Sequence, residues 1–266
     1  MLDLIKKSIS SISGRDAKTH ITREFLQLLI LKILYDKDYF KNLAFVGGTA
    51  LRFLHNLRRF SEDLDFSLIN KKGYKFDIFL ERVAYELRKA GFSLDIKKNI
   101  EETVQSAMFK FKDILYLLGL SKEKSQKLFI KLEVDSNPPK GWNTQLSLVS
   151  KHFVFTVTNF DIPSLYATKL HACFFRKYIK GRDFYDLIWY LGKKSIPNFE
   201  LLNNAIEQTE HKRINLNREN FNDFLKERLA TIDFVKVKKD VERFIEDKNE
   251  LKLLDKCVKN GTVLFS

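Results

Sequence analysis

The sequence predicts an α+β protein: a mixed β-sheet with flanking helices in residues 1–160, then a helical bundle in residues 161–266. Two observations predict this class. Short runs in which apolar and polar residues alternate, typical of half-buried strands, occur only before residue 159. After Pro163, apolar residues recur at helical spacing. We therefore place the domain boundary near residues 159–163.

The first domain should begin with helices and then form its sheet. A Ser-Asn-Pro-Pro-Lys-Gly loop at 136–141 interrupts the later strands, and Gly91 ends the longest helix between strands. The expected helices are parts of 2–12, 21–37 and 75–90, and the expected strands are 43–47, 63–68, 92–99, 103–112, 127–135 and 152–158.

The second domain opens with a helix whose first turn suits Pro163. The helical pattern runs from residue 164 to residue 178, and Gly181 is expected to end that element. The next helix opens with Asp183 and carries Asp186 on the same face. Acidic residues are favoured in a first helical turn, so capping is the structural alternative for Asp183.

A glycine turn follows the first expected strand. The apolar run 43–46 ends in Gly47-Gly48, where missing Cβ atoms allow a ligand's phosphates to approach the main chain. Thr49 is expected to cap a helix over residues 50–57, whose free N–H groups would face an anion. Taken alone, such a turn is usually only a turn.

Two carboxylates lie on the next strand. Leu64 and Phe66 alternate with Asp63 and Asp65, and side chains two residues apart on a strand point the same way. Paired carboxylates resist ionisation unless a cation lies between them. Magnesium prefers such oxygen ligands together with phosphate oxygens. The order of turn, helix and Asp-x-Asp therefore predicts a metal-dependent site that handles a nucleoside triphosphate.

A third carboxylate is expected on the strand at 127–135. There, one face of the strand carries Lys131, Glu133 and Asp135, and the opposite face is apolar. We expect Glu133 to be the third metal ligand, with Asp135 as the second choice. The alternative for each is an edge strand that carries charge to resist aggregation.

Two blocks of the sequence resemble one known family. The string GGTALRFLHNLRRFSEDLDF (47–66) resembles the polymerase-β nucleotidyltransferase superfamily and, within it, the AbiEii/AbiGii toxins of bacterial phage-defence and toxin–antitoxin loci. A second block, LYATKLHACFFRKYIKGRDFYDL (165–187), matches that family's lysine followed by Arg-Asp-x-x-Asp. The resemblance implies a polymerase-β-like catalytic domain, an NTP substrate and Mg²⁺, with Mn²⁺ as an alternative.

The resemblance and the residue chemistry together give a set of expected roles. Asp186 lies in an apolar stretch, so it should have a buried cationic partner, either Arg182 or Lys169. Lys169 is expected to contact phosphates, with a purely structural ion pair as the equal alternative. The expected catalytic residues are Asp63, Asp65, Glu133, Lys169 and Asp186; the metal ligands are Asp63, Asp65 and Glu133; the nucleotide-binding residues are Gly47, Gly48, Thr49, Arg59, Ser61, Lys169, Arg182 and Asp183.

The charge distribution favours a polyanionic partner. The net charge is +13, yet residues 201–266 carry 13 basic and 12 acidic residues, so an excess of +12 lies in residues 1–200. We therefore expect a nucleic-acid acceptor, and the resemblance makes tRNA the RNA candidate and a cognate antitoxin a further partner. The 24 Phe residues are interpreted as core, not as a base-stacking platform.

The remaining features set limits on location and function. No apolar run is long enough to span a membrane and no apolar signal core is visible, so the expected location is the cytoplasm. Cys173 and Cys257 are expected to be reduced, with Cys173 in the core. Two alternatives stay open: a catalytically weak or inactive nucleic-acid- or protein-binding module on the same scaffold, and nucleotidylation of a protein or a small molecule. The oligomeric state is left open.

Overall fold

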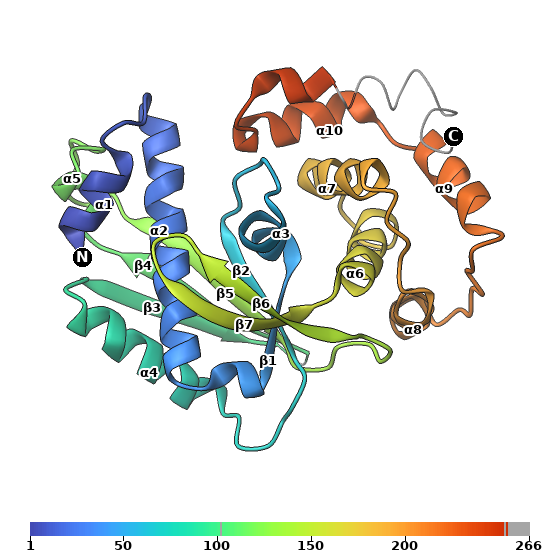
Figure 1. The fold of residues 1–266 in the computed structure, drawn as a ribbon, viewed down its shortest axis with the longest axis horizontal. Coiled ribbons are helices and arrows are strands. Elements are labelled where there is room, and N and C mark those ends of the chain that lie inside the picture. Colours follow the sequence, from blue (N-terminus) through green and yellow to red (C-terminus); the bar gives the residue numbers. More distant parts are fainter. Residues whose placement is uncertain (102, 253, 255–266) are drawn as a thin grey trace. The chain divides into compact units, whose positions relative to one another are not determined.

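The computed structural model describes residues 1–101, 103–252 and 254. Its strands form one mixed sheet with the order β3-β4-β5-β2-β1-β7-β6 (Figure 1). The predicted α+β class is confirmed. The strands are β1 (Leu43–Val46), β2 (Asp63–Leu68), β3 (Leu94–Ile100), β4 (Val104–Phe111), β5 (Leu128–Asp135), β6 (Thr144–Ser150) and β7 (Val154–Phe160).

The sheet is mixed because its central strands pair in both directions. β1 runs antiparallel to β2 and parallel to β7, and β2 runs parallel to β5. β4 runs antiparallel to both β3 and β5. The parallel pair β2–β5 brings the two predicted acidic strands side by side.

The alternating sequences of β2, β4 and β5 separate the two faces of the sheet. Leu64, Phe109 and Ile130 lie on the buried face, which packs with the helices α2 (Arg15–Asp36) and α4 (Phe76–Lys89). The other face carries Asp63, Asp65 and their neighbours, which are half-buried or exposed. The other helical elements of this part are α1 (Leu2–Ile9), η1 (Tyr39–Lys41), α3 (Gly47–His55) and α5 (Ile114–Leu117).

The chain after β7 is helical in the described residues. α6 packs on both α7 and α8, and α10 packs on α7. Pro163 lies in the first turn of α6, as predicted, and Cys173 is a buried free thiol in the same helix, whereas Cys257 lies outside the described residues. The elements are α6 (Ile162–Phe174), α7 (Gly181–Gly192), α8 (Phe199–Glu210), α9 (Phe221–Ala230), α10 (Phe234–Val241), η2 (Glu242–Phe244) and η3 (Lys248–Glu250).

The chain forms two compact units that do not follow its linear order. Unit 1 comprises residues 1–50, 61–138 and 146–159, and unit 2 comprises residues 51–60, 139–145 and those from 160 onward. Unit 2 therefore includes the Arg-Arg segment between α3 and β2. The functional domain boundaries at 1–160 and 161–266 stay a prediction.

Several predicted boundaries were wrong. α3 begins at Gly47, so Thr49 lies inside the helix instead of capping one at residues 50–57. α6 ends at Phe174, and Gly181 begins α7 instead of ending the helix before it. The reason for glycine there is packing: a Cβ at Gly181 would overlap the carbonyl oxygen of Val237 in α10. β6 and α5 were not predicted. Within the described residues, no helix combines the length and the apolar character needed to cross a membrane.

Candidate functional site

The glycine turn after β1 lies directly against an acidic side chain. Gly47 has φ +77°, a backbone conformation that L side chains rarely adopt. A Cβ built on Gly47 would overlap Oδ2 of Asp65 and come within 3.0 Å of the Asp65 Cβ. Gly48 follows as a buried residue of α3. The turn therefore needs glycine for two reasons, the positive φ and the carboxylate beside it.

Two hydroxyl groups join the start of α3 to the segment before β2. Thr49 Oγ1 lies 2.8 Å from Ser61 Oγ, and the Thr49 hydroxyl also donates to the backbone carbonyl of Asp63. Both hydroxyl-bearing residues are buried. These bonds fix the glycine turn relative to β2, so in the structure Thr49 and Ser61 support the carboxylate strand.

The carboxylates of β2 face a mixed-charge row on β5. The register pairs Asp63 with Lys131 and Asp65 with Glu133, while Asp135 lies two pairs further along the strand, opposite Ser67. Lys131 Nζ lies 2.7 Å from Glu133 Oε1. Burial alone would lower the pKa of Lys131, but Glu133 and the two aspartates reverse the effect and raise it. Lys131 is a functional candidate that the sequence analysis missed.

The donor set fits a magnesium ion that shares its coordination with a substrate. Asp63 and Asp65 project from one strand face beside a glycine turn that a Cβ would fill. Magnesium is commonly held by one or two carboxylates plus substrate phosphates. Residues 1–101, 103–252 and 254 contain no group of three or more Asp, Glu, His or Cys arranged to hold a metal, and Glu133 pairs with Lys131. Glu133 as a third ligand therefore stays a prediction.

A buried ionic cluster forms in unit 2. Arg59 donates from Nε and Nη2 to the two carboxylate oxygens of Asp186, both at 2.6 Å. Lys169 Nζ lies 2.7 Å from Asp183 Oδ1 and 2.8 Å from Asp186 Oδ2. Arg176 Nη1 adds a 3.1 Å bond to Asp183 Oδ2. Asp186 is 0% and Arg59 2% exposed, so the cluster is a core feature.

The cluster favours the charged forms of Asp183 and Lys169. Burial would raise the pKa of Asp183, but Lys169, Arg176 and Arg59 outweigh it and lower that pKa. Burial would lower the pKa of Lys169, but Asp183 and Asp186 outweigh it and raise that pKa. Each ion therefore depends on its neighbours for compensation in a low-dielectric environment.

Of the two residues predicted as the cationic partner of Asp186, Lys169 is confirmed. Lys169 is a partner, whereas the guanidinium of Arg182 lies 4.4 Å from the ring centre of Phe244. Arg59, expected at the nucleotide, is the second partner of Asp186, and its Nη1 donates to a backbone carbonyl. The nucleotide-binding roles of Arg59, Lys169, Arg182 and Asp183 stay predictions.

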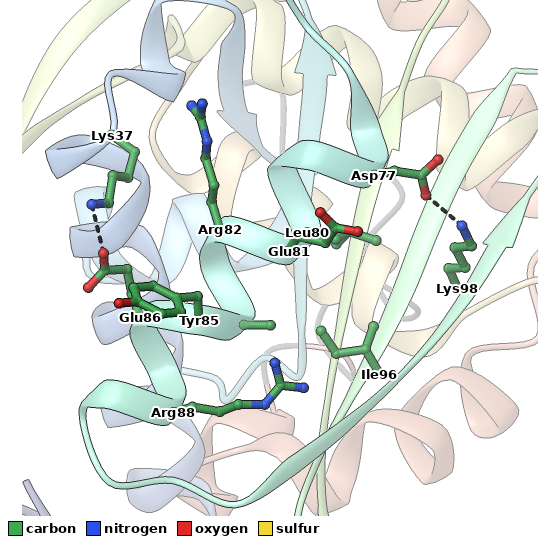
Figure 2. A pocket seen from close by; sticks show the side chains of 11 residues that line it. Lys37, Asp77, Leu80, Glu81, Arg82, Tyr85, Glu86, Arg88, Ile96 and Lys98 are labelled. Carbon is green, nitrogen blue, oxygen red and sulfur yellow. Dashed lines mark hydrogen bonds and ion pairs between the residues drawn. The ribbon is translucent and has the colours of Figure 1, made fainter.

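A separate cavity lies between α4 and β3, and no predicted site residue lines it. Its volume is about 780 Å³, and its lining includes Arg82, Tyr85 and Arg88 (Figure 2). Two ion pairs border it, Lys37–Glu86 at 2.7 Å and Lys98–Asp77 at 2.6 Å. Lys98 lines the cavity, and its neighbour Lys97 lies on the same face of the sheet as Asp63. Adjacent residues of a strand point to opposite faces, so the cavity lies on the side of the sheet that the helices cover.

The mixed sheet and the glycine turn beside Asp65 agree with the expected class, a nucleotidyltransferase. Comparison with known proteins gives the family. A family model described as "Nucleotidyl transferase AbiEii toxin, Type IV TA system" matches residues 29–260. The chain therefore belongs to the AbiEii family of nucleotidyltransferase toxins. A search of curated proteins finds no match.

Two solved structures from Helicobacter pylori are similar to this chain. JHP933 shares 20% identity, covering 90% of this chain and 93% of its own, with a TM-score of 0.46. A "putative nucleotidyltransferase" shares 21% identity, covering 90% of this chain and 96% of its own, also with a TM-score of 0.46.

Proposed function

We propose that this protein is a magnesium-dependent toxin that transfers a nucleoside monophosphate from an NTP to a hydroxyl of an RNA acceptor, with tRNA as the candidate. The supporting observation is the contact between the glycine turn at Gly47 and the carboxylate of Asp65, with Asp63 on the same strand face. This arrangement offers bare backbone to phosphates and oxygen ligands to a cation at one place.

Each candidate site residue of unit 1 has a distinct role in the proposed reaction. Asp63 and Asp65 would hold Mg²⁺, or Mn²⁺ in its place, and Gly47 and Gly48 would admit the triphosphate. Thr49 and Ser61 keep the turn in register with β2 through their hydrogen bonds. A bound divalent ion supplies charge stabilisation at the α-phosphoryl group and lowers the pKa of a coordinated hydroxyl.

The reaction is an in-line displacement. The acceptor oxygen forms a bond to the α-phosphorus, the bond from that phosphorus to the bridging oxygen of the β-phosphate breaks, and pyrophosphate leaves. The hydroxyl proton passes to water. The protein positions the reactants and supplies countercharge to the phosphates. The reaction needs no covalent intermediate with the protein.

The ionic cluster of unit 2 has a proposed role and a structural alternative. We assign Lys169 to contact with nucleotide phosphates and Asp183 and Asp186 to its orientation. Arg59 holds Asp186 through two parallel bonds, which fixes the carboxylate that in turn contacts Lys169. The alternative is that the cluster only stabilises the helices.

The test is incubation with NTPs labelled at the α-phosphate, magnesium and total RNA. Wild type and Asp77→Asn should label RNA, whereas Asp65→Asn should not. Asp77 is a matched control because its carboxylate is exposed and pairs with Lys98 near the α4 start. Equal labelling by wild type and Asp65→Asn, or its absence from both, contradicts the proposal. Sensitivity of the product to protease and not ribonuclease would identify a protein acceptor.

Two accompanying expectations follow from the family. A type IV toxin–antitoxin family implies a cognate antitoxin, which would protect cells that express this protein. Co-expression of the neighbouring gene product with rescue of growth would support that partner. The cytoplasm stays the predicted location, since a transferase that acts on RNA needs access to cellular RNA and NTPs.

A further inference from the structure

One face of the unit 1 sheet continues from the two aspartates to the edge of the sheet. The register places Asp63 beside Lys131 on β5, Lys131 opposite Met108 on β4, and Met108 opposite Lys97 on β3. Adjacent strands lie about 4.8 Å apart, so this row extends roughly 14 Å from Asp63 to the edge strand. We call the surface that carries this row and the next one the open face.

The next row of the open face begins at an exposed aromatic ring. Phe129 lies opposite Lys110 on β4, and Lys110 lies opposite Asp95 on β3. Phe129 is 46% exposed, whereas the residues on either side of it in β5 point to the opposite face and are buried. Its Cα lies about 8 Å diagonally from that of Asp63, one strand across and two residues along. An accessible aromatic surface therefore lies next to the carboxylates.

The outer part of the open face is positively charged. Lys97 is exposed and Lys110 is half-buried, and both project from the same side as Phe129. The nearby Asp95 carboxylate is neutralised, because Lys112 lies 2.6 Å and Lys127 lies 3.6 Å from its oxygens. This charge complements a phosphate backbone, which carries one negative charge per nucleotide in each strand.

We propose that the open face binds the single-stranded 3′ end of the acceptor nucleic acid, with Phe129 stacking on a base and Lys97 and Lys110 contacting phosphates. The inference rests on the proposed function and names the surface that presents the acceptor. Stacking on an aromatic side chain requires an unpaired base, which selects single strands over duplex. The proximity of Phe129 to Asp63 places the terminal hydroxyl near the carboxylates.

The test uses variants with matched partners on the other side of the sheet. Lys97 and Lys98 are neighbours on β3 that project from opposite faces, since only Lys98 pairs with Asp77 near the start of α4. Tyr85 on α4 is a second exposed aromatic residue, at 60%. Phe129→Leu and Lys97→Ala are therefore compared with Tyr85→Leu and Lys98→Ala, with circular dichroism confirming that each variant folds.

The probe is a fluorescein-labelled single-stranded RNA of about 12 nucleotides, titrated into the full chain at several salt concentrations. We expect Phe129→Leu to weaken binding roughly tenfold, as loss of one base stack should. Lys97→Ala should reduce the slope of log K against log salt by about one. Tyr85→Leu and Lys98→Ala should match wild type. Duplex RNA should bind more weakly than the single strand.

Several outcomes overturn the inference. These are wild-type affinity in Phe129→Leu, an unchanged salt slope in Lys97→Ala, an equal loss in either control variant, or no binding of single-stranded RNA by the wild type. Failure of the proposed function looks different, because it would remove Mg–NTP binding and label transfer, both measured without the RNA probe. If Phe129→Leu still transfers label to a protein as wild type does, the open-face inference fails while nucleotidyl transfer stands.

Discussion

At the scale of single residues, the glycine that precedes α3 carries the most stringent requirement. Gly47→Ala introduces a left-handed conformation at an L residue, which costs about 1–2 kcal/mol, and it drives a methyl group into Asp65 Oδ2. The carboxylate must then shift away from its present position. We expect Gly47→Ala to lower the free energy of unfolding and to reduce label transfer by at least about tenfold, measured by urea denaturation and the transfer assay.

Gly73→Ala separates the two causes. Gly73 has φ +72°, close to the +77° of Gly47, but a Cβ there would meet nothing within 4 Å. This variant should lose about 1–2 kcal/mol from backbone strain alone and keep full transfer activity. If the two variants lose activity equally, the contact between Gly47 and Asp65 has no catalytic significance.

At the scale of secondary-structure elements, the ionic cluster links α6, α7 and the segment before β2 within unit 2. Asp186→Asn leaves Arg59 and Lys169 with less compensation in a buried environment. Removing one partner of a buried pair typically costs about 3–5 kcal/mol. We expect a loss of that size in urea denaturation. The matched control is Glu207→Gln, which breaks the exposed Arg213–Glu207 pair in the same unit and should not measurably change stability.

The same cluster predicts a pH dependence. The pKa of Asp183 is lowered in the folded protein, so its stabilising charge is fully present above its ordinary value of 3.8 and is lost as pH falls through the lower folded pKa. Wild-type stability should therefore fall below about pH 5 with a slope that Asp183→Asn partly removes. Parallel curves for the two proteins between neutral and acid pH would contradict this assignment.

The sequence predicted individual strands and helices better than it predicted which strands lie side by side. Alternation in β2 and β5 is a local property, so both strands and their charged faces were predicted correctly. Register is not local, and it decides that Lys131 lies beside Asp63 and that Phe129 lies diagonally next to Asp63. β6 was not predicted, and its apolar Leu146 and Leu148 are both exposed, so they do not mark a core-facing side.

Long-range pairing explains the remaining differences. Arg59 and Asp186 are separated by 127 positions in the chain, and no spacing rule connects them. The apolar surroundings of Asp186 did predict a buried cation, because an isolated buried carboxylate is costly. Physical chemistry therefore specified the kind of partner, while the fold selected Arg59 in addition to Lys169 and placed Arg182 over an aromatic ring.

At the scale of the whole molecule, ligand binding to one compact unit can be measured as a rise in the midpoint of that unit's thermal unfolding. A ligand that binds only the native state stabilises it by about 2.7 kcal/mol at 100 times its Kd. Asp63 and Asp65 both lie in unit 1, so Mg–NTP should raise the midpoint of the transition that reports on unit 1.

Differential scanning calorimetry with magnesium alone, NTP alone and both together measures this linkage. Both together should give a larger shift than the sum of the separate additions, because the carboxylates and the phosphates share one ion. Asp65→Asn should abolish that extra shift, whereas Asp77→Asn, on the α4 side of unit 1, should retain it. The absence of a magnesium-dependent shift with any of the four NTPs would exclude the proposed metal–nucleotide site. The linkage thus tests, without measuring catalysis, whether the carboxylates of unit 1 bind a metal–nucleotide complex.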